Sequence, residues 1–396
     1  MPLTFQSLGD LRRVICRLCG QQATGRSIYR CPQLALPGRI GAVEDDTGPD
    51  AGTSAAAARV LATVGPGVLD RLAELSGSDF TSLMLEVARR RAARETPATV
   101  VRRYRNDRFV RPAQAPWQSL RRAEDVLTGN LPASYELLTL APLVPLGTHS
   151  ALATVSQDKV VTAMRACEVA ADPTNALALE AAVRRLARPR DIVRLGAVQR
   201  VVRAQQTAPG YLPHFGLLGL ATAGRDRGGR EFERAAVAEH VRALAAGLAA
   251  AGFAPVQLAL TPLSEAGESV AAAVAGELTG PVIDVITDRQ RQSGRGYYRD
   301  LCYKLNVSAA GQWQEVGDGG FTDWAARLTA SSKERLLISG VGIDRLAAFR
   351  SVTAIAGVVA TQPDERDQPQ NQPGADRVRQ RMYDDDEQDR GPGQQQ

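Results

Sequence analysis

Apolar residues recur at helical spacing between residues 83 and 88, and arginines occupy the opposite face as far as residue 94. Ser78 or Asp79 is placed to cap the start of this helix. An arginine stripe of this kind is typical of a solvated helix face, and RNA binding is the alternative. The segment predicts an amphipathic helix at the beginning of a folded core.

Short β-prone segments and a few helices follow this first helix. Because few helices separate the strands, the pattern predicts a mostly antiparallel sheet flanked by helices, an α+β form of the α/β class. No glycine-rich phosphate loop follows a strand, so a bound nucleotide would have to be held by arginines. Strands are expected at 192–197, 217–221, 255–260, 282–286, 297–307 and 336–339, and helices at 174–186, 233–251, 264–278 and from 342.

Composition divides the chain into a core and two polar extensions. Residues 1–58 are an appendage of low order that ends in a linker, and 59–77 form a lead-in with a short helix. Residues 78–350 form the core. The tail, 361–396, is rich in Gln, Asp, Arg and Pro and is expected to be disordered.

Charge and hydropathy bear on the ligands and the cellular location that the sequence predicts. The net charge is +5 although the tail carries nine acidic residues against five arginines, so the rest of the chain is more basic than the total. This excess suits a nucleotide or RNA, and it is equally normal for an arginine-rich composition. No long apolar stretch or export signal is present, so we expect a cytoplasmic protein without a membrane partner.

Three of the five cysteines, Cys16, Cys19 and Cys31, cluster near the N-terminus. Their spacing would suit a zinc knuckle, which needs a fourth ligand. None of the three histidines is near them in sequence. Free thiols are therefore the expectation, and no metal site is assigned.

The segment 195–205, continued by 214–219, resembles motif 2 of class II aminoacyl-tRNA synthetases of the histidyl branch. The resemblance assigns Arg200 to the α-phosphate of ATP and Phe215 to adenine, with Arg203 as a further nucleotide contact. A guanidinium can fork onto phosphate oxygens and an aromatic face can stack on a purine, so these residue types suit the roles.

The segment 339–346 resembles motif 3 of the same class, a glycine-rich strand that enters a helix. The resemblance assigns Arg345 to the γ-phosphate. It implies ATP, accompanied by Mg²⁺, as cofactor, with Arg200 and Arg345 as the catalytic residues. A surface ion pair at a helix start is the simpler interpretation of Arg345 alone.

Two further segments resemble the histidine-recognition strands of this branch. They supply the paired Tyr297 and Tyr298 and a glycine-rich turn, 317–323, that ends in Asp323. Upstream, Thr174 in the segment 172–175 stands where the branch holds the substrate amine, although helix capping explains that segment equally well. These residues are the predicted substrate contacts. The polar segment 145–175 also contains His149, for which a buried, hydrogen-bonded position is the expectation.

Departures from the branch leave the substrate open. Val202 stands where the branch has Glu, and Ser293 where it has Arg, with Arg291 and Arg295 as nearby substitutes. Phe321 also replaces an Arg. Histidine is therefore not the expected substrate, and a small carboxylate or another amino acid is.

Two functions are compatible with this resemblance. The first is an adenylate-forming ligase of the class II synthetase type, which would form an acyl-adenylate from ATP and the acid. The second is a non-catalytic relative, like the regulatory subunit of ATP phosphoribosyltransferase, that contacts a partner enzyme. The chain ends about 50 residues after Arg345, which leaves no room for an anticodon-binding domain. We therefore expect contact with tRNA at most at the acceptor end, and the resemblance implies a homodimer.

Overall fold

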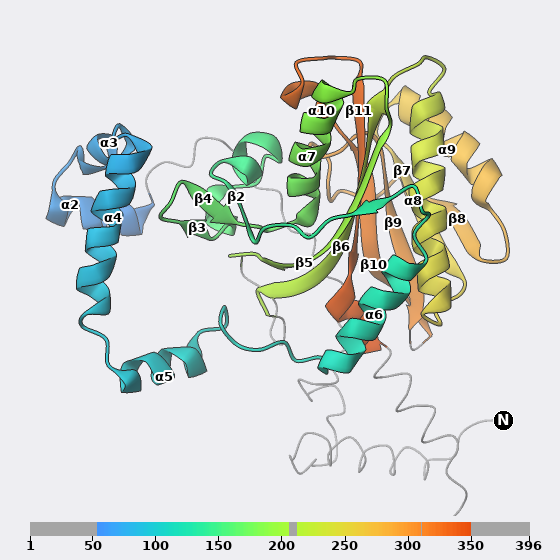
Figure 1. Ribbon diagram of the computed structural model, residues 1–396. Coiled ribbons are helices and arrows are strands. Elements are labelled where there is room, and N and C mark those ends of the chain that lie inside the picture. The colour runs from blue at the N-terminus through green and yellow to red at the C-terminus, as the bar shows by residue number, and fades with distance from the viewer. Residues whose placement is uncertain (1–53, 206–211, 310, 350–396) are drawn as a thin grey trace, which may run out of the picture. The chain divides into compact units, whose positions relative to one another are not determined.

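An eight-stranded sheet forms the centre of the computed structural model, which describes residues 54–205, 212–309 and 311–349 (Figure 1). The first and last pairs in the order are parallel and all the other pairs are antiparallel, so the predicted mostly antiparallel sheet is confirmed. In spatial order the strands are β1 (Glu136–Leu137), β5 (Val193–Val202), β6 (His214–Arg225), β11 (Glu334–Gly342), β10 (Gln312–Thr322), β9 (Arg299–Ala309), β7 (Val256–Pro262) and β8 (Ile283–Thr287).

Helices cover both faces of this sheet. On one face α7 (Pro173–Ala187) packs against β5 and β6, and its Leu177, Ala178 and Ala181 are fully buried there. On the other face lie α8 (Glu231–Ala250), α9 (Glu265–Leu278) and α6 (Trp117–Gly129). We call the first the α7 face.

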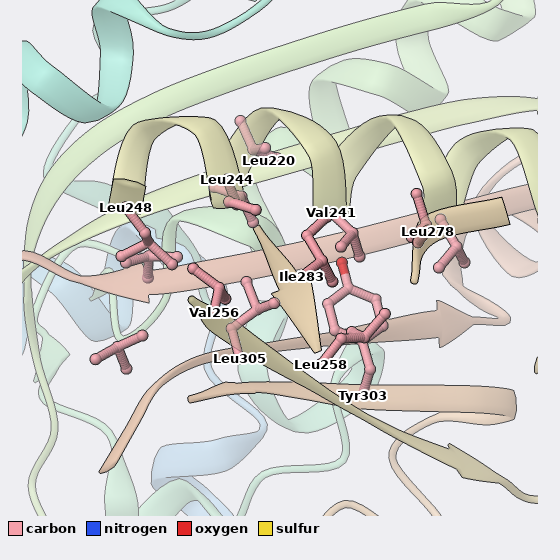
Figure 2. Packing of buried hydrophobic residues seen from close by; sticks show 14 of the residues in the cluster. Leu220, Val241, Leu244, Leu248, Val256, Leu258, Leu278, Ile283, Tyr303 and Leu305 are labelled. Carbon is pink, nitrogen blue, oxygen red and sulfur yellow. The ribbon is translucent and has the colours of Figure 1, made fainter. Parts of the chain in front are cut away.

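The largest hydrophobic cluster lies under α8. Val241, Leu244 and Leu248 follow one another at helical spacing and point at strand residues such as Leu258 and Leu305, as Figure 2 shows. All are almost completely buried, and each such side chain contributes about 1.5–3 kcal/mol by leaving water. The alanines between them let the helix lie close to the sheet.

The predicted glycine-rich turn at 317–323 is wrong, because residues up to Thr322 belong to strand β10. Side chains of neighbours occupy the places where Cβ atoms would be. A Cβ on Gly320 would lie 2.5 Å from Tyr298 Cδ1, and one on Gly319 would lie 2.7 Å from Tyr303 Cζ. The glycines therefore let two tyrosine rings pack flat on the strand.

A small antiparallel sheet precedes α7. It contains β2 (Leu143–Pro145), β4 (Cys167–Val169) and β3 (Thr162–Ala163), in that order. Between β2 and β3 run a π-helical turn, Thr148–Leu152, and a 3-10 turn, Gln157–Lys159. The short helix α10 (Trp324–Leu328) connects β10 to β11, and residues 343–349, after β11, are helical.

Between residue 54 and α6 the structure has four helices, and no residue in them is buried. The predicted linker to residue 58 is too long, because Ser54 already caps the first helix. The next amphipathic helix is capped by Ser76, two residues earlier than expected. The predicted cysteine cluster and disordered tail lie outside the described residues. The four helices are α2 (Ala55–Val64), α3 (Val68–Ala73), α4 (Gly77–Ala92) and α5 (Pro97–Asn106).

Candidate functional site

The start of α7 supplies the first part of a polar site. Asp172 Oδ1 accepts hydrogen bonds from the backbone N–H of Thr174 at 2.9 Å and from its hydroxyl at 2.7 Å. This is the capping contact expected from the sequence. The second carboxylate oxygen of Asp172 is not needed for the cap and turns to Arg203 instead, at 3.2 Å.

Arg203 joins the cap to strand β6. Its guanidinium carbon lies 5.1 Å from the centre of the Phe215 ring, and its Nε donates to the carbonyl of Ala171 at 3.0 Å. These contacts hold the planar group flat against the aromatic face. The hydrogen bonds of Arg203 to the described residues use Nε and Nη2, and 34% of its side chain is exposed.

Strand alternation explains why Arg203 and not Arg200 is near Phe215. In the register of the β5–β6 hairpin, Val201 is paired with Phe215 and Arg200 with Gly216. Paired residues share a face and successive residues alternate, so Phe215 lies on the α7 face and Arg200 on the opposite one. There Arg200 forms an ion pair with Asp344 at 3.0 Å.

Tyr298, Arg291 and Asp318 form the second part of the site. The Tyr298 hydroxyl donates to Asp318 Oδ2 at 3.2 Å, and Arg291 Nη2 donates to the same oxygen at 3.1 Å. Protein atoms surround the Asp318 carboxyl while 40% of its side-chain area remains open to water. Burial raises the pKa of Asp318, and the charge of Arg291 opposes that shift.

Arg291 is unusually enclosed for an arginine, with 3% of its side chain exposed. Its Nε donates to the Ser293 carbonyl at 2.8 Å, but Nη1 has no hydrogen-bond partner among the described residues. Buried N–H groups are nearly always paired, and leaving one unpaired costs about 1–3 kcal/mol. Because this atom is closed off from solvent, an acceptor oxygen of a ligand would reach it only when neighbouring side chains shift.

Tyr297 lies between the two parts. It shares a hydrogen bond with Thr174, and its ring meets those of Tyr298 and Trp324 edge to face, with centroids 4.9 and 5.4 Å apart. Burial raises the pKa of its hydroxyl, and the negative charges of Asp172 and Asp318 raise it further. Both carboxylates are thus close enough to act on one phenol.

Between these groups lies Gly340 of β11, which has no side chain to cover the sheet. Gly340 is paired with Gly219 on one side and with Asp318 on the other. A Cβ built on Gly340 would meet only a backbone oxygen, at 3.9 Å, so open space lies above it. The candidate site is therefore the open space at Gly340 on the α7 face together with the polar side chains of Asp172, Thr174, Arg203, Tyr297 and Asp318, and we call this region the Gly340 hollow.

No protein-family model matches the sequence, and no curated protein sequence does either. Solved structures do match. The chain resembles histidyl-tRNA synthetases in structure. One match is an ATP phosphoribosyltransferase regulatory subunit/histidyl-tRNA synthetase from Bacillus halodurans, at 14% identity and a TM-score of 0.47, over 61% of this chain and 83% of that one.

Two further matches are histidyl-tRNA synthetases themselves. The Nostoc enzyme is 11% identical with a TM-score of 0.48, over 64% of this chain and 75% of the enzyme. The apo enzyme of S. aureus is 14% identical with a TM-score of 0.46, over 60% and 66%. These structures are of the branch that the sequence motifs resemble.

The structure brings together five of the residues predicted from the sequence. Arg203, Phe215, Thr174, Tyr297 and Tyr298 line or support the Gly340 hollow. Asp318 lies in the segment 317–323 but received no role from the sequence, and Arg291 was expected only as a substitute for an arginine of the branch. Arg291 lies in the loop between β8 and β9 and Asp318 lies in β10, so no local motif indicates their pairing.

Three predicted residues contact other groups. Arg200 pairs with Asp344, as described above, and also hydrogen-bonds His214 at 3.0 Å. Arg345 donates to the carbonyl of Glu315 in β10. Asp323 forms ion pairs with Arg299 and Arg327, at 3.2 and 3.7 Å.

Two classes of feature are missing from the described residues. Within the three described ranges no helix is long and apolar enough to cross a membrane. In the same part of the chain no three His, Cys, Asp or Glu side chains gather as metal ligands would.

Proposed function

We propose that the protein binds ATP and a small carboxylate or amino acid in the Gly340 hollow and joins them as an acyl-adenylate. The observation that carries this proposal is Arg203 held flat on Phe215 beside an open glycine floor. Adenine would stack on the Phe215 ring, and the guanidinium of Arg203 would meet the α-phosphate.

Arg291 gives the acid its place. Its unpaired Nη1 is buried next to Tyr298 and Asp318, and a carboxylate oxygen is an acceptor of the right charge for it. The ammonium of an amino acid would face Asp318, which is an acceptor when ionised. The hollow can thus hold both ends of an amino acid on opposite charges.

The chemistry that these residues support is phosphoryl transfer without a protein nucleophile. A carboxylate oxygen attacks the α-phosphorus, the bond to the bridging oxygen breaks, and pyrophosphate leaves with the electron pair. Arg203 stabilises the charge on the α-phosphate during the transfer. Mg²⁺ would be held chiefly by phosphate oxygens, because the described residues contain no cluster of three ligands.

Arg200 and Arg345 favour a second candidate, a non-catalytic regulator that contacts a partner enzyme. The motif resemblance assigns both residues to phosphates, but Arg200 pairs with Asp344 and Arg345 donates to the Glu315 carbonyl. Such a protein would bind a ligand in the hollow without turning it over. In either case we predict a homodimer that does not charge tRNA with histidine.

ATP–pyrophosphate exchange across a panel of amino acids and small acids separates the two candidates. Exchange with at least one acid supports adenylation. Calorimetric binding of ATP or an acid without any exchange supports the regulator. Absence of both ATP and acid binding contradicts the proposed site.

A further inference from the structure

A buried hydrogen-bonded pair, His149 and Glu168, lies outside the proposed ligand contacts. His149 Nδ1 is 2.5 Å from Glu168 Oε1, and the two side chains are 1% and 0% exposed. They belong to the π-helical turn and to β4, the elements that lead into the start of α7.

The buried carboxylate of Glu168 receives its hydrogen bonds from protein groups. Besides the imidazole, it accepts from the backbone N–H of His149 at 2.8 Å and of Gly147 at 3.3 Å, and from Gln157 Nε2 at 3.0 Å. Burial by itself raises the pKa of Glu168, but the bonds from Gln157 and His149 outweigh it and lower the pKa below its usual value. The group is therefore a carboxylate at neutral pH.

This carboxylate determines which imidazole nitrogen carries the proton. Nδ1 lies against Glu168 and donates to it, so Nε2 of the neutral ring keeps its lone pair. That lone pair accepts from the backbone N–H of Ala171 at 3.0 Å. If Nε2 also carried a proton, its N–H would point at the Ala171 N–H, and this hydrogen bond could not form.

Ala171 is held from both sides. Its N–H is bonded to His149, and its carbonyl accepts from Arg203 Nε at 3.0 Å. The next residue is Asp172, which caps α7 and pairs with Arg203. One backbone unit thus connects the buried imidazole to the two charged walls of the hollow.

We propose that His149 is a positioning residue: through Ala171 it sets the placement of Asp172 and Arg203, and so the affinity of the hollow for nucleotide. The effect on ligand affinity rests on the proposed function. The effect on the Ala171 amide and on Arg203 does not, and it can be measured in the free protein.

Two variants separate positioning from plain stability. In His149→Asn the shorter amide reaches Glu168 and donates to it, but does not reach Ala171. In His149→Gln the longer amide oxygen reaches the Ala171 N–H, but Glu168 loses its imidazole donor. We expect the Asn variant to melt somewhat lower, because the buried Ala171 N–H loses its acceptor, and to lose about tenfold in ATP affinity. The Gln variant should melt lower and bind ATP within about threefold of the parent.

Hydrogen exchange measured by NMR provides the second readout. The Ala171 amide and the Arg203 Nε–H should exchange faster in His149→Asn than in the parent, and stay protected in His149→Gln. If both groups stay protected in the Asn variant, or if the two variants lose affinity in step with melting temperature, positioning by His149 is wrong. If the parent itself binds no ATP, the proposed function fails, and the exchange measurement still decides the role of His149.

Discussion

Arg203 and Phe215 meet on one face of the sheet because Val201, two residues before Arg203, is paired with Phe215 across the β5–β6 hairpin. Arg200 is offset by an odd number of residues from Arg203 and projects to the other side. The two arginines resemble each other in sequence context, and only the register of the hairpin distinguishes their environments.

Arg203→Ala should weaken ATP binding by roughly ten- to a hundredfold, because a charge-assisted contact of about 1.5–3 kcal/mol is lost. Arg203→Lys should recover only part of the affinity, since an ammonium keeps the charge without the planar fork. Arg200→Ala is the matched control and should change ATP affinity less. Calorimetry on the three variants measures this, and a larger loss in Arg200→Ala would favour the assignment made by motif resemblance.

Gly340→Val should block the hollow without unfolding the protein. The open space above Gly340 can take a Cβ, and a β-branched residue suits a strand. Gly219→Ala is the contrasting variant, because its Cβ would lie 2.7 Å from Pro173 Cγ and should lower the melting temperature. Calorimetry and thermal melts on both variants test this. Normal ligand binding by Gly340→Val would show that the ligand site lies elsewhere.

Arg291→Met should weaken binding of the acid while ATP alone still binds. The substitution keeps an apolar side chain over Tyr298 and removes the buried N–H that has no partner. It also removes the positive charge beside Asp318, so the pKa of Asp318 should rise further. Exchange kinetics should show a raised KM for the acid. An unchanged KM for the acid contradicts the assignment of its carboxylate to Arg291.

His240 should make the protein less stable as the solution is acidified. Burial lowers the pKa of this fully buried imidazole to about 3, and Arg194 adds to the effect. The unfolded chain binds a proton below about pH 6.5 while the folded one does not, so stability falls as pH falls from 6.5. The loss is about 2 kcal/mol at pH 5.

Urea unfolding at pH 5 and pH 7 measures this loss. His240→Gln should be less stable at both values but should show a smaller difference between them, since it has no titrating imidazole. An equal difference in the parent and the variant would assign the pH dependence to other groups. His240 is held by Ser339 and Thr222, both bonds being between neutral groups.

The elements of the core could be predicted because their patterns are local. The helix 264–278 begins with a serine that caps it, and its apolar positions recur along one face; the structure has it at Glu265–Leu278 with Ser264 as the cap. The antiparallel sheet also followed from the spacing of strands. Strand β10 was missed because its glycines are typical of turns, and the tyrosines that fill their places come from other elements.

The site could be predicted only in part, for a related reason. Thr174, Tyr297 and Phe215 stand in segments whose order along the chain resembles a known family. The importance of Asp318 and Arg291 depends on a contact across 27 positions, and the face on which an arginine lies depends on pairing register. Neither is encoded in a short stretch of sequence.

The position of β11 has a consequence for how the protein is made. This strand is the last of the sheet in the chain, yet it lies between β6 and β10. Until residues 334–342 leave the ribosome, the sheet consists of two halves with unpaired edges, which are prone to association with other chains. Gly340 belongs to this same strand, so a nascent chain has no floor for a ligand, and a ligand can stabilise only those chains whose synthesis has passed it.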